Sequence, residues 1–131
     1  MYKEIFICII TVVMIIAINT LMEKYTQETV KILSENLVEL RNELPNEENE
    51  NDEETMNKKL DLVCEEWDKR YNILTCYLEH NELEKIETNL TILKSSIECN
   101  EYSDAKCKLD EIIFGLHHIE EKNKLDIKNV F

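Results

Sequence analysis

The sequence has very little glycine and proline and no excess of basic residues, and these shortages exclude several protein classes. It holds one Gly and one Pro among 131 residues. Turn-rich β folds need both residue types, so the composition favours helices. The formal net charge of −13 disfavours nucleic acid as a partner, because both molecules would be negative. We therefore expect an all-α protein that binds no nucleic acid.

Motifs that carry chemistry are also missing. The sequence contains no Gly-rich phosphate loop, no nucleophile elbow, no CxxC pair and no Glu-x-x-His. Neighbouring carboxylates such as Asp61 and Glu65 are expected from composition alone, since 33% of the residues are charged. We therefore expect no enzymatic activity, no catalytic residues and no cofactor.

Histidines and cysteines leave a second function open. Cys76 and His80 have the i, i+4 spacing that places two side chains on one helix face, and His117 and His118 are adjacent. A structural zinc site needs about four ligands, so we interpret the histidines as helix-end residues and predict no metal site. The cysteines after residue 22 are interpreted as small buried side chains, or as a disulfide in an oxidising compartment. A metal- or redox-sensing module is the alternative function.

The first long feature that is present is an uncharged apolar run at residues 5–22. As a helix it is about 27 Å long, close to the thickness of bilayer hydrocarbon. The residues after Ala17 are Ile, Asn, Thr, Leu and Met, which do not form a small-x-small cleavage site. The run therefore predicts a retained transmembrane anchor in the cell membrane, crossing once. The positive-inside rule, applied to Lys3, favours a cytoplasmic segment 1–4 and an extracytoplasmic domain 23–131.

Apolar residues at helical spacing predict four helices in that domain, at about 23–44, 52–79, 82–98 and 102–120. The anchor is expected to continue into the first of them without a break. Pro45 ends that helix, and residues 45–53 form an acidic linker. Asn51 with Glu54, and Asn81 with Glu84, have capping-box spacing at two predicted helix starts.

The first and third predicted helices carry apolar residues at matching positions, related by an offset of 53: Val30, Leu33, Leu37, Leu40 and Leu44 correspond to Leu83, Ile86, Leu90, Leu93 and Ile97. The second and fourth helices align at an offset of 49, through the shared triplet KLD at Lys59 and Lys108. Two tandem helical hairpins, or a four-helix bundle, would explain this. Chance similarity between amphipathic helices is the other explanation.

Several residues stand out as structural or interaction candidates. Trp67 is the single tryptophan and is predicted to anchor the core. The tail holds Leu125, Ile127, Val130 and Phe131, enough apolar side chains to dock on the bundle.

The order of these features resembles a family of small membrane-anchored proteins of clostridia and related Firmicutes, the domain of unknown function 4363. The resemblance covers nearly the whole chain and is carried by Trp67, the turn from His80 to Leu83, His118 with Ile119, and the closing residues to Phe131. The long acidic insertion after Pro45 departs from the pattern. The resemblance implies no catalytic residues, and it implies a multi-pass membrane protein as a partner, since such genes often lie beside one.

Together these observations predict a non-enzymatic, single-pass membrane protein with an extracytoplasmic helical module for protein interaction. A protein partner is expected, and a homo-oligomer is the further option. Trp67, His80, Leu83, His118 and Phe131 are the residues expected to shape or form the interacting module.

Overall fold

The computed structural model describes residues 1–45 and 53–130, and within these ranges the chain folds into four helices and no strand. The elements are α1 (Tyr2–Glu43), α2 (Glu53–Thr75), α3 (His80–Glu98) and α4 (Tyr102–Val130). The expected all-α class is confirmed. Asn51 and Phe131, to which a cap and an interaction role were assigned, lie outside the described residues.

Helix α1 runs without interruption through both the apolar segment (residues 5–22) and the first helix of the domain that follows. No Gly or Pro occurs before Pro45, so nothing in the sequence breaks the backbone ladder. Leu44 has the extended ψ of 136° expected of a residue that precedes proline. The predicted continuity of anchor and first bundle helix is therefore confirmed as one 42-residue helix.

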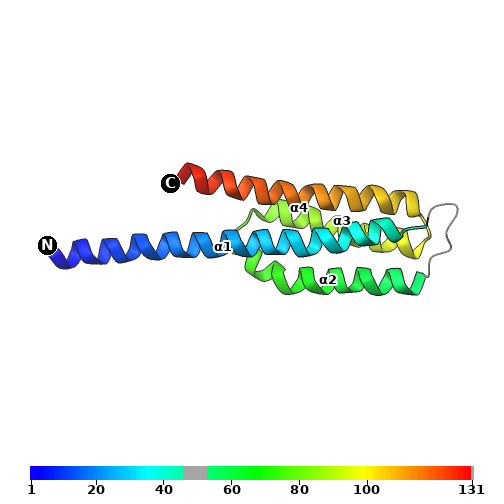
Figure 1. The fold of residues 1–131 in the computed structure, drawn as a ribbon, viewed down its shortest axis with the longest axis horizontal. Helices are drawn as coiled ribbons and strands as arrows, with labels where there is room; N and C mark the ends of the chain where they lie inside the picture. Colours follow the sequence, from blue (N-terminus) through cyan, green and yellow to red (C-terminus); the bar gives the residue numbers. More distant parts are fainter. Residues whose placement is uncertain (46–52, 131) are drawn as a thin grey trace.

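The four helices form an antiparallel bundle in which each helix packs on two others (Figure 1). α1 lies against α2 and α4, and α3 lies against the same two helices. Across the described residues there is no contact between the diagonal pairs α1–α3 and α2–α4. The closed ring identifies a four-helix bundle, because α1 and α4 would not touch in two separate hairpins.

Apolar residues at the predicted positions fill the interior of the bundle. All ten members of the offset-53 series in α1 and α3 are at most 5% exposed. In α2 and α4 the offset-49 pairs Met56–Ala105, Leu60–Leu109, Val63–Ile112 and Trp67–Leu116 are buried as well. The seam read from the sequence is thus the core.

Both helix boundaries at the α2–α3 turn differ from the prediction. α2 ends at Thr75, and His80 is already the first residue of α3, with Glu79 in the N-cap position. The Glu79 carbonyl accepts the amide of Leu83, and no side chain caps the helix, so the predicted Asn81 cap is wrong. At this earlier end of α2 the side chains of Thr75 and Cys76 both donate to the Asn72 carbonyl.

The connection from α3 to α4 uses a left-handed residue. Asn100 has φ of 57°, and the amide of Glu101 bonds back to the Ser96 carbonyl at 2.8 Å. This is the usual way to close a helix C-terminus, and asparagine tolerates it better than most residues. The Tyr102 hydroxyl donates to the Asn100 side-chain oxygen at 2.6 Å, which fixes the first turn of α4.

Helix α4 extends ten residues beyond its predicted end near residue 120, to Val130. Leu125 is 60% exposed, and the side chains of Ile127, Val130 and Phe131, on which the predicted docking also depends, lie outside the described part of the chain. Lysines and leucines in the tail are good helix formers, and no Gly or Pro stops them. In Figure 1 this end of α4 runs beside α1, past the turn that joins α2 to α3.

Candidate functional site

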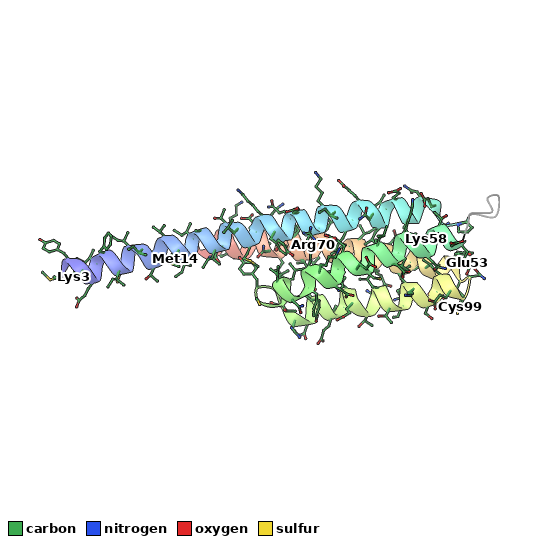
Figure 2. The ribbon with its side chains drawn as sticks, turned by 90° about the horizontal axis from the view of Figure 1, so that it is seen from below. Lys3, Met14, Glu53, Lys58, Arg70 and Cys99 are labelled. Atoms are coloured by element: carbon green, nitrogen blue, oxygen red, sulfur yellow. The ribbon has the colours of Figure 1, made fainter. Side chains whose placement is uncertain are left out.

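The bundle has two ends of different character. We call the end beside the apolar segment, where α2 ends and α3 begins, the proximal end, and the end that holds Glu53 and Cys99 the distal end (Figure 2). Three of the five buried polar residues, Thr26, Thr29 and Asn123, belong to the proximal end. Buried polar groups lower the stability of the fold unless they have hydrogen-bond partners, so the proximal end is expected to contain a network of polar contacts.

Arg70 holds a polar cluster together at the proximal end of α2. Its Nε donates to Glu66 Oε1 at 2.6 Å, and an Nη donates to the Thr29 hydroxyl at 3.0 Å. The guanidinium carbon lies 5.3 Å from the centre of the Tyr25 ring, within cation–π range. The Arg70 side chain is 13% exposed, so these groups supply most of its partners.

Thr29 belongs to this cluster through α1. Its hydroxyl donates to the Tyr25 carbonyl at 2.8 Å while it accepts from Arg70, so both of its roles are satisfied. Glu28 adds a looser ion pair with Arg70, at 4.0 Å. We call Tyr25, Glu28, Thr29, Glu66 and Arg70 the Arg70 cluster. It joins α1, just after the apolar segment, to the last turns of α2.

The internal repeat shows where the cluster breaks the apolar pattern. At an offset of 49, Arg70 corresponds to Ile119 and Leu74 corresponds to Asn123, and Leu74, Ile119 and Asn123 are all buried. Two core positions are thus aliphatic in one of the helices α2 and α4 and polar in the other. Both positions follow Trp67 in α2 and Leu116 in α4, so the exchange of aliphatic for polar residues lies at the proximal end.

Burial and hydrogen bonding shift two ionisable groups here. The hydrogen bond from Arg70 lowers the pKa of the Glu66 carboxyl, because it favours the charged form. Burial raises the pKa of the Tyr71 hydroxyl, and the carboxylates of Glu87 and Glu84 add to the effect. At neutral pH Glu66 is therefore an ionised carboxylate that pairs with the Arg70 guanidinium, and Tyr71 is a neutral phenol. Both states suit a role in holding helices together.

An aromatic row connects the core to the α2–α3 turn. The rings of Trp67 and Tyr71 are 5.8 Å apart and tilted, and Tyr71 lies 6.5 Å from the ring of His80. Trp67 is 2% exposed, as predicted for a core anchor, and its Nε1 is buried without a hydrogen-bond partner. The sequence candidates Trp67 and His80 are thus brought into one row by Tyr71, which the sequence reading did not select.

The other candidates fall in separate places. Leu83 is fully buried in the core, one turn into α3. His118 is exposed on α4, where its ring stacks on Phe114 at 6.3 Å. The side chain of Phe114 is 73% exposed, so this pair presents aromatic surface to the surroundings.

The cysteines and histidines do not gather in one place. Cys64, Cys76, Cys99 and Cys107 are free thiols, three of them exposed, so their prediction as buried side chains is wrong except for the half-buried Cys64. Cys76 lies in the turn after α2 and His80 begins α3, so the pair does not share a helix face. In the described part of the chain no group of three His, Cys, Asp or Glu residues could hold a metal.

Cys64 is the thiol that burial affects most clearly. Desolvation raises its pKa, with Lys94 acting in the opposite direction. A thiol with a raised pKa is a poor nucleophile and a poor sensor of oxidants. Cys64 is therefore a poor candidate for redox sensing, whereas Cys76, Cys99 and Cys107 are exposed thiols, for which the sensing alternative stays a prediction.

Hollows in the described surface are small or open. One of about 70 Å³ lies at the α2–α3 turn, lined by Tyr77, Leu78, Glu79, Glu82, Ile119, Lys122 and Asn123. That volume suits a few water molecules, whereas sites for small molecules measure hundreds of cubic ångströms. A larger open groove of about 570 Å³ lies between α1 and the end of α4, lined by Glu23, Glu121, Lys124, Leu125 and Lys128.

The Arg70 cluster was not predicted from the sequence, because apolar periodicity does not report contacts between polar side chains. A signal was available: Arg70 stands three residues after Trp67 and four before Leu74, which is the spacing of a core position, although Tyr71 beside it also packs on the core. A charged residue at a core position needs a partner, which would have pointed to the cluster. Thr26 and Thr29 extend the α1 seam toward the apolar segment in the same way.

One comparison with known proteins gives a match. The family model described as Domain of unknown function (DUF4363) matches residues 20–130, which is most of the chain. The chain belongs to this family. No curated protein and no solved structure matches it. The match begins inside the apolar segment, so Trp67, His80, Leu83 and His118 all lie within the family domain.

Proposed function

We propose that this member of the DUF4363 family is a non-enzymatic, single-pass membrane protein whose four-helix bundle is a protein-interaction module. One observation carries the proposal. α1 is a single helix whose apolar half is uncovered while its other half is a full member of the bundle. A helix of this length and composition, with none of its most apolar window buried, needs an apolar surrounding other than the bundle.

The two threonine hydroxyls of the apolar segment are compatible with a bilayer. The Thr11 hydroxyl donates to the Ile7 carbonyl and the Thr20 hydroxyl to the Ile16 carbonyl, each at 2.9 Å. Both hydroxyls are thereby satisfied within the helix, as hydrocarbon requires. Figure 2 shows Lys3 and Met14 on the part of α1 that stands clear of the other helices.

The proposed topology has residues 1–4 in the cytoplasm and the bundle outside. It is supported by Lys3, the positive charge directly before the segment. A reporter that is active only outside the cytoplasm, fused after Phe131, is expected to be active. A cytoplasmic reporter at the same position serves as the control and is expected to be silent. The reverse result would reject the topology.

The interaction role is supported by the exposed Phe114–His118 stack and by the lack of an enclosed cavity of substrate size among the hollows described above. Exposed aromatic residues are enriched where proteins bind one another. The partner proposed is a second membrane protein, since α1 would bring the bundle to the membrane surface. Self-association is the second possibility that the same experiment tests.

A photo-crosslinking amino acid at Phe114 tests this in native membranes. A crosslinked product is expected at Phe114 and not at Leu62, which is 64% exposed on α2 and is the matched control. The mass of the product separates a homo-oligomer from a different partner. Monomer alone at both positions would contradict the interaction role, and equal products at both would show that the Phe114–His118 stack is not the contact.

A further inference from the structure

The last turns of α4 lie beside the place where α1 leaves the apolar segment. The open groove defined above joins Glu23 of α1 to Lys124, Leu125 and Lys128 of α4. Glu23 directly follows Met22, the last residue of the apolar segment. The two helices are antiparallel (Figure 1), so α4 residues after Leu125 lie toward the apolar segment and not away from it.

Burial along α1 shows that this overlap enters the apolar segment itself. Asn19 and Met22 are half-buried, whereas the other residues from 5 to 21 are exposed. Asn19, Met22, Glu23 and the buried Thr26 share one helix face by their spacing. α4 is the helix that reaches furthest along α1 in this direction, so it supplies the cover.

The end of α4 has the chemistry of a membrane-surface helix. Residues 124–130 contain two lysines and one aspartate, a net charge of +1, in a chain whose total is −13. Apolar residues alternate with these charges: Leu125, Ile127, Val130 and Phe131. Leu125 is 60% exposed, and Lys128 is exposed beside it in the groove. Basic residues among large apolar ones are typical of segments that lie in the headgroup region.

Two neighbouring groups fit this arrangement. Lys124 pairs with Glu120 at 3.0 Å, and Glu120 lies one turn further from the apolar segment. Glu23 and Glu121 also line the groove, so its wall is mixed in charge. Lys124 and Lys128 follow Glu121 along α4 toward the apolar segment, where Lys128 and Glu23 line the groove together. The positive charge is therefore placed where lipid phosphates would be met.

We infer that the end of α4, from Lys124 to Val130, lies in the headgroup region of the bilayer that α1 spans and binds anionic phospholipid there. The inference rests on the proposed membrane anchoring. Lys124 and Lys128 meet the phosphates while Leu125 faces the upper acyl chains. The bundle then stands on two helices, α1 and α4, and not on a single flexible stalk, which fixes its tilt toward a membrane partner.

Tryptophan quenching by brominated lipids in vesicles of full-length protein tests this. Leu125→Trp is compared with Phe114→Trp, which is similarly exposed on the same helix but about 16 Å further from the apolar segment. The constant signal of the buried Trp67 is subtracted with the unsubstituted protein. With lipids brominated near the headgroup, Leu125→Trp is expected to lose about twofold more fluorescence than Phe114→Trp. Equal quenching of the two would overturn the inference.

A second comparison tests the lipid charge. Quenching of Leu125→Trp is expected to be stronger in vesicles that contain phosphatidylglycerol than in pure phosphatidylcholine. The double substitution Lys124→Glu and Lys128→Glu is expected to remove that difference, and Lys106→Glu with Lys108→Glu near the distal end to leave it unchanged. The same quenching in both lipids would overturn the binding of anionic headgroups.

Met14→Trp separates this inference from the proposed function. Met14 lies near the centre of the apolar segment, and lipids brominated deep in the acyl chain are expected to quench a tryptophan there. If Met14→Trp is quenched and Leu125→Trp is not, the anchor stands and the role of α4 fails. If neither is quenched, the membrane anchor itself is wrong.

Discussion

Away from the proximal end the helices meet through mainly aliphatic side chains, with Ser34 and Ser96 as the buried polar residues described there, whereas at the proximal end threonine, asparagine and arginine share the interior. The distal end is held at its surface by exposed ion pairs between helices, such as Arg41 with Asp110 and Lys94 with Asp61. The proximal end also has an exposed pair, Lys122 with Glu79, but there the pair of Arg70 with Glu66, both in α2, is more buried, with side chains 13% and 29% exposed.

The aliphatic end contributes mainly to the free energy of folding, and the polar end contributes mainly to the choice of one arrangement of the helices. Aliphatic layers contribute most of the free energy of folding but accept small shifts of one helix past another. A satisfied polar cluster contributes less and fixes one arrangement, because any shift would leave buried groups without partners. The Arg70 cluster thus sets the rotation and height of α1 against α2 just after the apolar segment. That is the position from which a proposed anchor would orient the whole bundle.

The largest effect is expected in the aliphatic core. Leu37 is fully buried in α1, and Leu37→Ala is expected to lower the free energy of unfolding by about 3 kcal/mol. Val38→Ala, on the exposed neighbour, is the control and is expected to change little. Chemical unfolding in detergent, followed through the fluorescence of the buried Trp67, measures both. Similar losses at the two positions would show that the core is not packed as described.

Arg70→Ala should have the next largest effect. It removes the partner of Glu66 and Thr29 and the cation over Tyr25, and we expect a loss of about 2 kcal/mol. Arg70→Lys is expected to recover only part of it, because an ammonium does not reproduce the fork of two donors.

The matched control is Arg41, which also makes a two-donor pair, with Asp110, but at an exposed position. Arg41→Ala is expected to be much milder than Arg70→Ala, since exposed ion pairs contribute little. If the two substitutions cost the same, the contrast drawn between the two ends of the bundle is wrong.

The fold was predictable from the sequence to a large degree, and the reasons are physical. Val30 to Leu44 and Leu83 to Ile97 repeat at helical spacing, and such periodicity reports burial directly. Periodicity did not decide whether the two hairpins close into one ring, because an apolar stripe identifies the buried face of a helix but not the helix that packs on it. The end of α4 was missed since the charge-rich sequence after Ile119 gives little periodicity.

The proximal cluster was not predictable in the same way. Arg70 stands at a core position of α2, but the sequence does not name its partners: Thr29 lies 41 residues earlier, in α1, and Tyr25 lies one turn before Thr29. Thr29 is buried although its residue type is mostly exposed, because the Tyr25 carbonyl and Arg70 satisfy its hydroxyl. Long-range polar pairing of this kind leaves no periodic trace in one sequence.

Trp67→Phe sharpens the comparison at the boundary between the two ends. The indole Nε1 is buried without a hydrogen-bond partner, which is a cost that phenylalanine does not carry. The smaller ring leaves a gap, so the two effects oppose each other, and we expect a net change of about 1 kcal/mol or less. Unfolding followed by circular dichroism measures it. A loss as large as that of Leu37→Ala would mean that the lost volume dominates.

The smallest expected effect is a pH dependence located in the Arg70 cluster. The hydrogen bond from Arg70 lowers the pKa of Glu66 in the folded protein below its value in the unfolded chain, so the unfolded state binds more protons in this range. The stabilisation is therefore complete above the unfolded pKa, about 4.3, and is lost as the pH falls through the folded value.

Glu66→Gln should remove this part of the acid sensitivity, and Glu65→Gln, on the exposed neighbour, should keep it. Unfolding measured between about pH 3 and 6 for the three proteins compares them. Because many other carboxylates titrate in the same range, only the difference between the two substitutions reports on the cluster, and identical curves for them would place the acid-sensitive pairing elsewhere in the bundle.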